Sequence, residues 1–265
     1  MEHDDRDSVL AAGLARAVEH DERANLAART RVVVLAGGRG RRLEPYTSVL
    51  PKPLMPIGNR AILEILVQQL TEAGFLEVTL CVGYLSHLIR AVFDNGHDRG
   101  LRVTYVKEDE PLGTAAPLRL VPDLDSTFVA MNGDLLTTID YGQFLAHHHA
   151  SDNVLTIATH RRRLVSDYGV LRFDDASEPL RVSAYQEKPE MHLDVSMGIY
   201  AIEPGALEFV PEGEPSDFPD LVHALLDAGK RVGAYPFEGL WLDIGRHEDY
   251  VRAIELWESG TPNES

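Results

Sequence analysis

The stretch VVVLAGGRGRRLEPYT, residues 32–47, decides the fold of this chain. Its opening residues 32–36 form a short, uncharged and mostly β-branched run, which predicts a buried strand. The glycines that follow allow the backbone to approach a ligand closely, with N–H groups free to point at it; they are Gly37, Gly38 and Gly40. Positive charge at the same place comes from Arg39, Arg41 and Arg42. Strand, glycine turn and arginines together predict a phosphate-binding loop.

This loop matches neither of two familiar nucleotide-binding patterns. A P-loop requires a lysine directly after its second glycine, and none stands there. A dinucleotide-binding fingerprint requires a third glycine where this chain has Leu43. Downstream, in PKPLMPIG, prolines on both sides of Lys52 restrict the backbone and hold its ammonium group in a limited region. We therefore expect Lys52 to act together with the glycine loop.

The composition is typical of one folded domain that binds neither nucleic acid nor a membrane. The chain has 265 residues, of which 44% are hydrophobic, so it can build a sizeable core. Its formal net charge of −17 disfavours a nucleic acid or an anionic membrane as a partner. The single cysteine, Cys81, excludes an internal disulfide framework and is expected in the core. No apolar stretch approaches the roughly 18 residues of a membrane span, and the acidic N-terminus is unlike a signal peptide, so we expect a cytoplasmic protein.

Strands alternate with helices through residues 31–140. Strands are expected at 32–36, 77–83, 102–108 and 127–134, and helices at 62–74, at 86–94 and briefly after residue 118. Such alternation predicts parallel strands with right-handed crossovers. The fold class is therefore α/β, with a doubly wound, Rossmann-like sheet whose ligands lie at the carboxyl ends of its strands.

The second half of the chain, residues 141–258, is richer in strands. They are expected at 153–160, 169–174, 181–189 and 195–202, followed by a helix at 218–228, strands within 231–245 and a last helix from near residue 247. We therefore expect a mixed sheet and one domain over residues 31–258, with a first lobe at about 31–140 and a smaller strand-rich lobe at about 141–258.

Three segments receive structural rather than functional interpretations. Residues 1–30 are expected to form a helical extension or arm. The HHH run at 147–149 is not expected to bind a metal, because adjacent residues of a helix point about 100° apart. The HRRRL run at 160–164 is expected to be a solvated loop end.

A resemblance to a known family covers residues 31–250. The segment LAGGRGRRLEPYT, followed by LPKPLMPIG, is similar to the signature of the sugar-1-phosphate nucleotidyltransferases, and its style is closest to the guanylyltransferase-like branch. Four further motifs follow in the family's order: EDEPLGTAAPL at 108–118, NGD at 132–134, EKP at 187–189 and WLDIG at 241–245. The resemblance implies the nucleotide-diphospho-sugar transferase fold, in which the smaller lobe binds the sugar.

The resemblance also implies a role for each matching residue. Catalysis is assigned to Arg42, Lys52 and Asp134. Nucleotide binding is assigned to Leu35, Ala36, Gly37, Gly38, Gly40, Arg42, Lys52, Gly83, Leu112, Gly113, Thr114 and Asp134. Sugar-phosphate binding is assigned to Tyr168, Gly169, Glu187, Lys188, Ser196 and Gly198. Asp134 and Asp243 are the implied ligands of a Mg²⁺ ion.

The physical chemistry of the implied reaction agrees with these residue types. Joining a sugar 1-phosphate to a nucleoside triphosphate brings two anions together and releases pyrophosphate, so catalysis depends on positioning and charge neutralisation. Mg²⁺ prefers carboxylate oxygens, and arginine offers a bidentate fork that suits Arg42 on the leaving pyrophosphate. The family usually has Thr or Ser where this chain has Arg41, whose side chain we expect to point outward or to lie at the periphery of the site.

The substrates are only partly defined. The PLGTA form resembles guanylyltransferases more than thymidylyltransferases, so GTP is favoured, with dTTP, UTP, CTP and ATP left open. Many relatives carry Asn-Ala-Gly where this chain has Ser196-Met197-Gly198, which leaves hexose, heptose, amino-sugar and cyclitol phosphates open. The alternative function is a non-catalytic, nucleotide-sugar-binding regulatory subunit, although no charged site residue is lost. Among oligomeric states we expect a homodimer.

Overall fold

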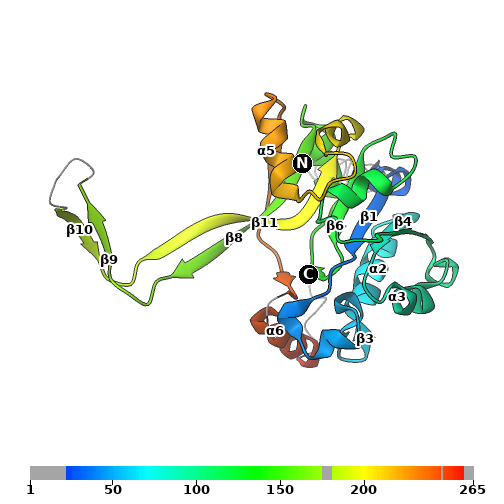
Figure 1. Cartoon of the computed structure of the whole chain (residues 1–265), viewed down its shortest axis with the longest axis horizontal. Coiled ribbons are helices and arrows are strands. Elements are labelled where there is room, and N and C mark those ends of the chain that lie inside the picture. Colours follow the sequence, from blue (N-terminus) through cyan, green and yellow to red (C-terminus); the bar gives the residue numbers. More distant parts are fainter. Residues whose placement is uncertain (1–21, 175–180, 246, 260–265) are drawn as a thin grey trace, which may run out of the picture.

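A seven-stranded mixed sheet forms the centre of the protein (Figure 1). The computed structural model describes residues 22–174, 181–245 and 247–259. The strand order is β12-β8-β11-β6-β1-β4-β5. These strands are β1 (Arg31–Ala36), β4 (Glu77–Val82), β5 (Arg102–Lys107), β6 (Phe128–Asn132), β8 (Leu155–Val165), β11 (Glu190–Ile202) and β12 (Val232–Phe237). Strands β5, β4, β1 and β6 are parallel, whereas β11 runs antiparallel to both of its neighbours. The predicted doubly wound α/β fold with a mixed sheet is therefore confirmed.

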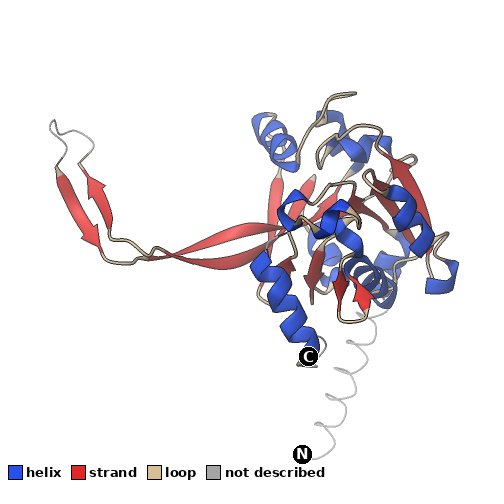
Figure 2. Cartoon of the chain, turned by 60° about the horizontal axis from the view of Figure 1, so that its bottom comes forward, coloured by secondary structure: helices blue, strands red, loops and turns tan. Residues whose placement is uncertain are grey.

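Helices cover both faces of this sheet, as Figure 2 shows. Successive side chains of a strand point to opposite faces of a sheet, so alternate residues of β1 pack into two apolar layers, one on each face. Val32 and Val34 lie in one apolar cluster with α2 and α4, and Val33 lies in a second cluster with α5. The helices are α2 (Ile62–Glu72), α3 (Ser86–Phe93), α4 (Tyr141–His149), α5 (Phe218–Asp227) and α6 (His247–Glu258).

Cys81 lies on the same face of the sheet as Val33 and is fully buried. Burial raises the pKa of its thiol to about 12, so the sulfur stays protonated and unreactive. Its predicted place in the core is confirmed. In the N-terminal segment, residues 22–29 are helical, and the earlier part of the predicted extension lies outside the described residues.

Short elements connect the main ones. Three two-stranded sheets pair β2 (Pro56–Ile57) with β3 (Arg60–Ala61), β7 (Leu135–Thr137) with β13 (Trp241–Asp243), and β9 (Val170–Phe173) with β10 (Val182–Gln186). The short 3₁₀ helices are η1 (Arg41–Leu43), η2 (Tyr46–Ser48), η3 (Lys52–Leu54), η4 (His97–Arg99), η5 (Ala116–Leu120) and η6 (Pro204–Phe209). Among the described residues, no helix has the length and apolar character needed to span a bilayer.

Strands β8 and β11 continue far beyond the sheet and form a ribbon that ends in the β9–β10 hairpin (Figure 1). We call residues 161–193 the arm; its residues 175–180 lie outside the described residues. The HRRRL run at 160–164 belongs to β8, so the prediction of a loop end is wrong. The local sequence is misleading because the carboxylates that pair with these arginines come from β11, about 30 residues later; they are Asp194 and Glu190.

Candidate functional site

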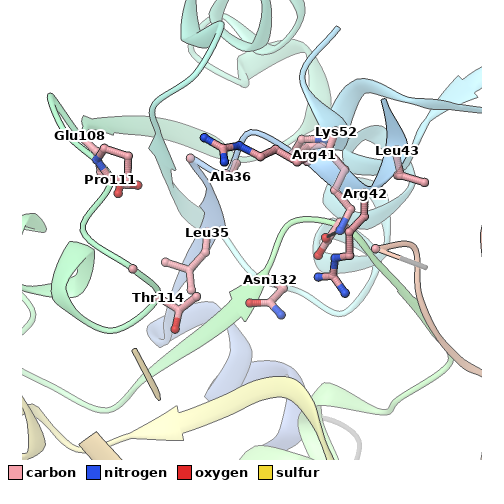
Figure 3. A pocket seen from close by; sticks show the side chains of 17 residues that line it. Leu35, Ala36, Arg41, Arg42, Leu43, Lys52, Glu108, Pro111, Thr114 and Asn132 are labelled. Atoms are coloured by element: carbon pink, nitrogen blue, oxygen red, sulfur yellow. Dashed lines mark hydrogen bonds and ion pairs between the residues drawn. The ribbon is translucent and has the colours of Figure 1, made fainter. Parts of the chain in front are cut away.

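A cavity of about 430 Å³ opens where β1 and β6 end (Figure 3). Ten residues predicted to bind the nucleotide line it: Leu35, Ala36, Gly37, Gly38, Gly40, Arg42, Lys52, Gly113, Thr114 and Asp134. Its other lining residues are Arg41, Leu43, Pro53, Glu108, Pro111, Asn132 and Gly245. The fold thus brings the glycine loop, the PLGTA segment and the NGD motif to one edge of the sheet, as the α/β topology requires.

The glycine loop leaves bare backbone at the cavity. A Cβ atom at Gly38 would meet nothing within 4 Å, so the main chain borders open space there. A Cβ atom at Gly37 would collide with the Glu108 carboxylate. Gly40 has a φ of 64°, in the left-handed region, and a Cβ atom there would lie 3.0 Å from side-chain carbons of Lys52 and Thr47. The glycines therefore serve both the turn and the close approach of a ligand.

The two arginines after the loop both face the cavity, but in different directions. In Figure 3, Arg41 extends over the side of Ala36, whereas Arg42 points toward the side of Asn132. Both lie on the turn η1, which begins directly after Gly40. Arg41 is exposed and lines the cavity, so of the two predicted placements, outward or peripheral, the structure shows the peripheral one.

Among the described residues, four charged groups gather beside Gly245. A Cβ atom on this glycine would lie 2.7 Å from Lys52 Nζ, 2.9 Å from Asp243 Oδ1 and 3.5 Å from an Arg42 guanidinium nitrogen. Lys52 Nζ forms an ion pair with Asp134 Oδ2. Burial lowers the pKa of Lys52 to about 8, nearby Asp243 opposes that change, and Arg42 adds to it. A compact charge cluster of both signs therefore stands at one end of the cavity.

The two aspartates of this cluster fit a small divalent cation. Lys52 contacts only one oxygen of Asp134, and the Gly245 N–H donates to Asp243 Oδ1 at 2.9 Å. Within the described residues, no partner is recorded for Asp134 Oδ1 or Asp243 Oδ2. Mg²⁺ is commonly held by one or two carboxylates together with water and substrate phosphates, and that donor set is available here.

The PLGTA segment is fixed by the start of α5. Gly113 has a φ of 86°, and a Cβ atom there would lie 2.6 Å from the carbonyl oxygen of Ser216. The Thr114 backbone N–H and hydroxyl donate to Asp217 Oδ1 at 2.9 and 3.0 Å, and the Phe218 N–H donates back to the Thr114 hydroxyl at 3.0 Å. These contacts within the chain fix this wall of the cavity without the help of a ligand.

Two predicted nucleotide-binding residues support the cavity without lining it. Gly83 lies behind the glycine loop, where a Cβ atom would be 2.9 Å from the carbonyl oxygen of Gly37. Leu112 packs against the apolar cluster that contains Phe218. Neither residue belongs to the lining of this cavity.

A second cavity, of about 260 Å³, adjoins the first and shares Asn132 with it. It is lined by Ser196 and Gly198, two of the predicted sugar-phosphate residues, and by Asp243. Among the described residues, the lysine or arginine that lines it is Arg162, which pairs with Asp249 at 3.0 Å and stacks over Trp241. The Trp241 Nε1–H donates to the Met197 carbonyl oxygen at 3.0 Å and holds β13 against β11.

The remaining predicted sugar-phosphate residues lie elsewhere. Tyr168, Gly169, Glu187 and Lys188 belong to the arm, at the base of the β9–β10 hairpin, and they line neither cavity. Lys188 has a φ of 43°, an unusual value for a residue with a side chain. Gly169 lies against Tyr185, whose ring a Cβ atom would strike. In a single chain the structure therefore does not bring Lys188 to the cavities.

Sequence reasoning missed several residues of the site. Asn132 stands inside the NGD motif, but only the aspartate of that motif was selected. Glu108 opens the EDEPLGTAAPL segment and lines the first cavity, and Gly245 closes WLDIG beside the charge cluster. Asp217 carried no local signal, because its role depends on a contact with Thr114, about 100 residues away.

Comparison with known proteins agrees with this architecture. The family model described as "Nucleotidyl transferase" matches residues 31–260. The UTP–glucose-1-phosphate uridylyltransferase of Synechocystis is 31% identical over 244 residues, covering 84% of this chain and 62% of the relative. The mannose-1-phosphate guanyltransferase of Saccharomyces cerevisiae is 28% identical over 232 residues, covering 85% of this chain and 64% of the relative. The chain thus spans less than two thirds of the length of these relatives.

Solved structures show the same fold. HddC from Yersinia pseudotuberculosis superimposes with a TM-score of 0.67 at 26% identity, covering 86% of this chain and 99% of HddC. HddC has also been solved in complex with GMP-PN, and this chain superimposes on that structure with a TM-score of 0.64 at 25% identity over the same shares of both chains.

Proposed function

Because the chain belongs to the nucleotidyl transferase family, we propose that it joins a sugar 1-phosphate to a nucleoside triphosphate and releases pyrophosphate. One observation carries the proposal: the glycine loop, Arg42, Lys52 and Asp134 line one cavity that adjoins a second. A non-catalytic nucleotide-sugar-binding subunit is the alternative, and it would not need to retain all of these charged groups.

In the proposed reaction, a phosphate oxygen of the sugar 1-phosphate attacks the α-phosphorus, and the bond to the leaving pyrophosphate breaks. Backbone N–H groups of the glycine loop bind the triphosphate. Arg42 presents its fork to the pyrophosphate as charge grows there, and Lys52 neutralises charge on the α-phosphate. The second cavity, with Ser196 and Gly198, receives the sugar. Lys188 binds the sugar phosphate.

The proposed cofactor is Mg²⁺, held by Asp134 and Asp243. Bound there, it would supply positive charge that screens the two substrates from each other. We expect excess EDTA to abolish turnover and added Mg²⁺ to restore it. Asp243→Asn should lower turnover strongly while leaving the thermal unfolding midpoint close to that of the wild type, since the half-buried side chain lines the second cavity and is not part of the apolar core. Full turnover in EDTA would contradict the assignment.

GTP is the proposed donor, and Glu108 supports that choice. Burial raises the pKa of Glu108, partly offset by the Leu112 N–H at 3.3 Å, and no ion-pair partner for it is recorded among the described residues. Guanine presents two adjacent N–H donors on its pairing edge, which can satisfy both oxygens of one carboxylate. Uracil and thymine present a single N–H between two carbonyl oxygens, which a carboxylate repels. HddC, solved with GMP-PN, is a relative that accepts a guanine ligand.

The decisive experiment measures pyrophosphate release with each of five nucleoside triphosphates and a panel of hexose, heptose, amino-sugar and cyclitol phosphates. Turnover with any pair establishes the reaction, and binding without turnover for all pairs favours the regulatory alternative. Glu108→Gln should lower kcat/KM for GTP about tenfold and leave UTP little changed, because an amide cannot accept both guanine N–H groups. Glu110→Gln, an exposed neighbour, is the matched control.

The proposal also covers the domain limits, the partners, the cellular location and the oligomeric state of the enzyme. We propose one nucleotidyltransferase domain at 31–258, with a nucleotide-binding lobe at about 31–140 and a sugar-phosphate-binding lobe at about 141–258. Nucleoside triphosphate and sugar 1-phosphate are its partners, and the acidic composition argues against nucleic acid. We also propose that it works in the cytoplasm as a homodimer.

A further inference from the structure

Asn132 lies at the junction of the two cavities. It ends β6, and among the described residues it is the one that lines both cavities. In Figure 3 its side chain projects from β6 into the opening, with Arg42 on one side and Leu35 on the other. A chemical group that moves from the first cavity to the second therefore meets the Asn132 amide.

The alternation of β6 explains why a polar side chain stands at this junction. Phe128 and Ala130 point to the same face of the sheet as Asn132, and both are fully buried in the apolar layer that contains α5. The next residue on that face, Asn132, is polar and half-buried. The apolar layer thus ends where the cavities begin, and β6 presents an amide to them.

The neighbouring strand β11 leaves room for this amide. Gly198 lies next to the last register pair between β11 and β6, and a Cβ atom on it would lie 2.5 Å from Asn132 Nδ2. Gly198 has a φ of 73°, in a stretch where the register of β11 with β8 shifts, and its N–H donates to the Ser196 hydroxyl at 3.2 Å. Glycines and bulges inside strands often mark places where a ligand approaches closely.

The proposed reaction gives a hydrogen-bond donor a use at this place. An oxygen of the sugar phosphate forms a bond to the α-phosphorus, and the bond from the α-phosphorus to pyrophosphate breaks, with the electron pair leaving on the pyrophosphate. The α-phosphoryl group is the part that changes partners between the two cavities, and its non-bridging oxygens are negatively charged. An amide N–H stabilises such an oxygen, whereas a carboxylate would repel it.

We propose that Asn132 is a catalytic residue whose Nδ2–H donates to a non-bridging oxygen of the α-phosphoryl group during the transfer. This inference rests on the proposed function for the reaction, whereas the choice of residue rests on the shared lining and on the space that Gly198 leaves. The hydrogen bond is made when the group lies between the cavities. Asn132 therefore affects the rate of transfer more than the binding of either substrate.

The first test separates transfer from binding. In single-turnover pyrophosphate release with the best substrate pair, we expect Asn132→Ala to lower the rate about 10²-fold, with calorimetric affinities for both substrates little changed. Asn132→Asp should lower the rate further, because it places a carboxylate beside the phosphoryl oxygens. Asn132→Ser keeps a shorter donor and should recover part of the rate. Asn95→Ala, at an exposed position outside both cavities, is the matched control and should keep the wild-type rate.

The outcomes distinguish the proposal from the function on which it rests. A wild type without turnover on any substrate pair refutes the proposed function and the role of Asn132 with it. An active wild type with an unaffected Asn132→Ala refutes the role of Asn132 alone. Weaker sugar-phosphate binding with a full rate at saturation also overturns the proposal, because Asn132 would then contact only the bound sugar phosphate.

The second test asks whether Gly198 acts through the amide. Gly198→Ala should lower the single-turnover rate, in part because its Cβ atom displaces Asn132 Nδ2. Backbone strain and any lost sugar contact act whether or not the amide is present. The same substitution should therefore cost at least tenfold less in the Asn132→Ala background, a coupling that a double-mutant cycle measures. Equal costs in both backgrounds would mean that Gly198 does not position the amide, and would overturn the proposed placement of Asn132.

Discussion

Strands β8 and β11 behave differently at their two ends. At the inner ends, Leu155, Ala158, Ile199 and Ile202 are fully buried and help to form the two apolar layers of the body. At the outer ends, Leu164 and Leu193 leave close to half of their surface exposed. The same pair of strands is thus part of the core at one end and a bare ribbon at the other. In the proposed site, the nucleotide half is complete within the body, whereas the sugar-phosphate half is divided between the second cavity and Lys188 on the arm.

The largest effect is expected for the complete half. Arg42→Ala should lower turnover on the order of 10²–10³-fold, because the leaving pyrophosphate loses its fork as its charge grows. Arg39→Ala is the matched control, since Arg39 stacks over Tyr84 and does not line the cavity. Single-turnover pyrophosphate release measures both. Equal losses for the two variants would mean that the loop acts only through its total charge.

The divided half should respond differently. Lys188→Ala should lower kcat/KM for the sugar phosphate at least tenfold, the scale of one charge-assisted hydrogen bond, and leave triphosphate affinity unchanged. Arg172→Ala, on the same hairpin, is the control for a general loss of positive charge from the arm. Calorimetric titration of each substrate separates the two affinities. A matching loss of triphosphate affinity would contradict the division of the site.

Arg41 tests how much an exposed residue at the edge of the nucleotide half contributes to triphosphate affinity. Its side chain extends over the cavity but is exposed, so Arg41→Thr should weaken triphosphate binding about fivefold, near 1 kcal/mol, with turnover at saturation little changed. Titration of the triphosphate measures this. Unchanged affinity would mean that the side chain leaves the cavity in solution. A loss of turnover as large as that of Arg42→Ala would mean that the alignment of this loop is wrong by one residue.

These two halves also differ in how well the sequence predicts them. The complete half follows from local patterns: a β-branched run, a glycine turn and a proline-framed lysine fix β1, its loop and Lys52 within about 20 residues. Even there, the sequence left open whether Arg41 points outward or lies at the periphery of the cavity, because that depends on the turn that follows the left-handed Gly40.

The arm could not be predicted in the same way. Three consecutive arginines hide the alternation expected of a strand, and their partners Glu190 and Asp194 are distant in sequence. Helix α4 was not among the predicted elements, although the HHH run at its end was interpreted with helix geometry. It begins at Tyr141, directly after Asp140, whose side chain accepts the Gln143 N–H at 2.9 Å. In both cases the element is marked by specific hydrogen bonds of its side chains rather than by a periodic pattern of hydrophobic residues.

The smallest expected effect concerns the inner ends of the same strands. His148 is 1% exposed and joins α4 to both: Nδ1 lies 2.7 Å from the hydroxyl of Thr156 on β8, and Nε2 lies 3.0 Å from the carboxylate of Glu203, which follows β11. Burial lowers its pKa, and the neighbouring His147 and His149 lower it further, while Glu203 opposes the change. The folded protein therefore takes up this proton at a lower pH than the unfolded chain, whose histidine titrates near 6.5.

Below about pH 6.5 the unfolded state binds more protons at this position, so the free energy of unfolding should fall as the pH falls. The contribution of His148 between pH 6.5 and 5.5 is at most about 1.4 kcal/mol, and it levels off once the folded state is also protonated. Urea unfolding across this range, at one protein concentration, should show a smaller loss of stability for His148→Gln than for the wild type. His87→Gln, at an exposed position of α3, should keep the wild-type slope. If His148→Gln keeps that slope as well, this end of β8 and β11 is not held by a neutral histidine, and the inner and outer ends differ only in apolar burial.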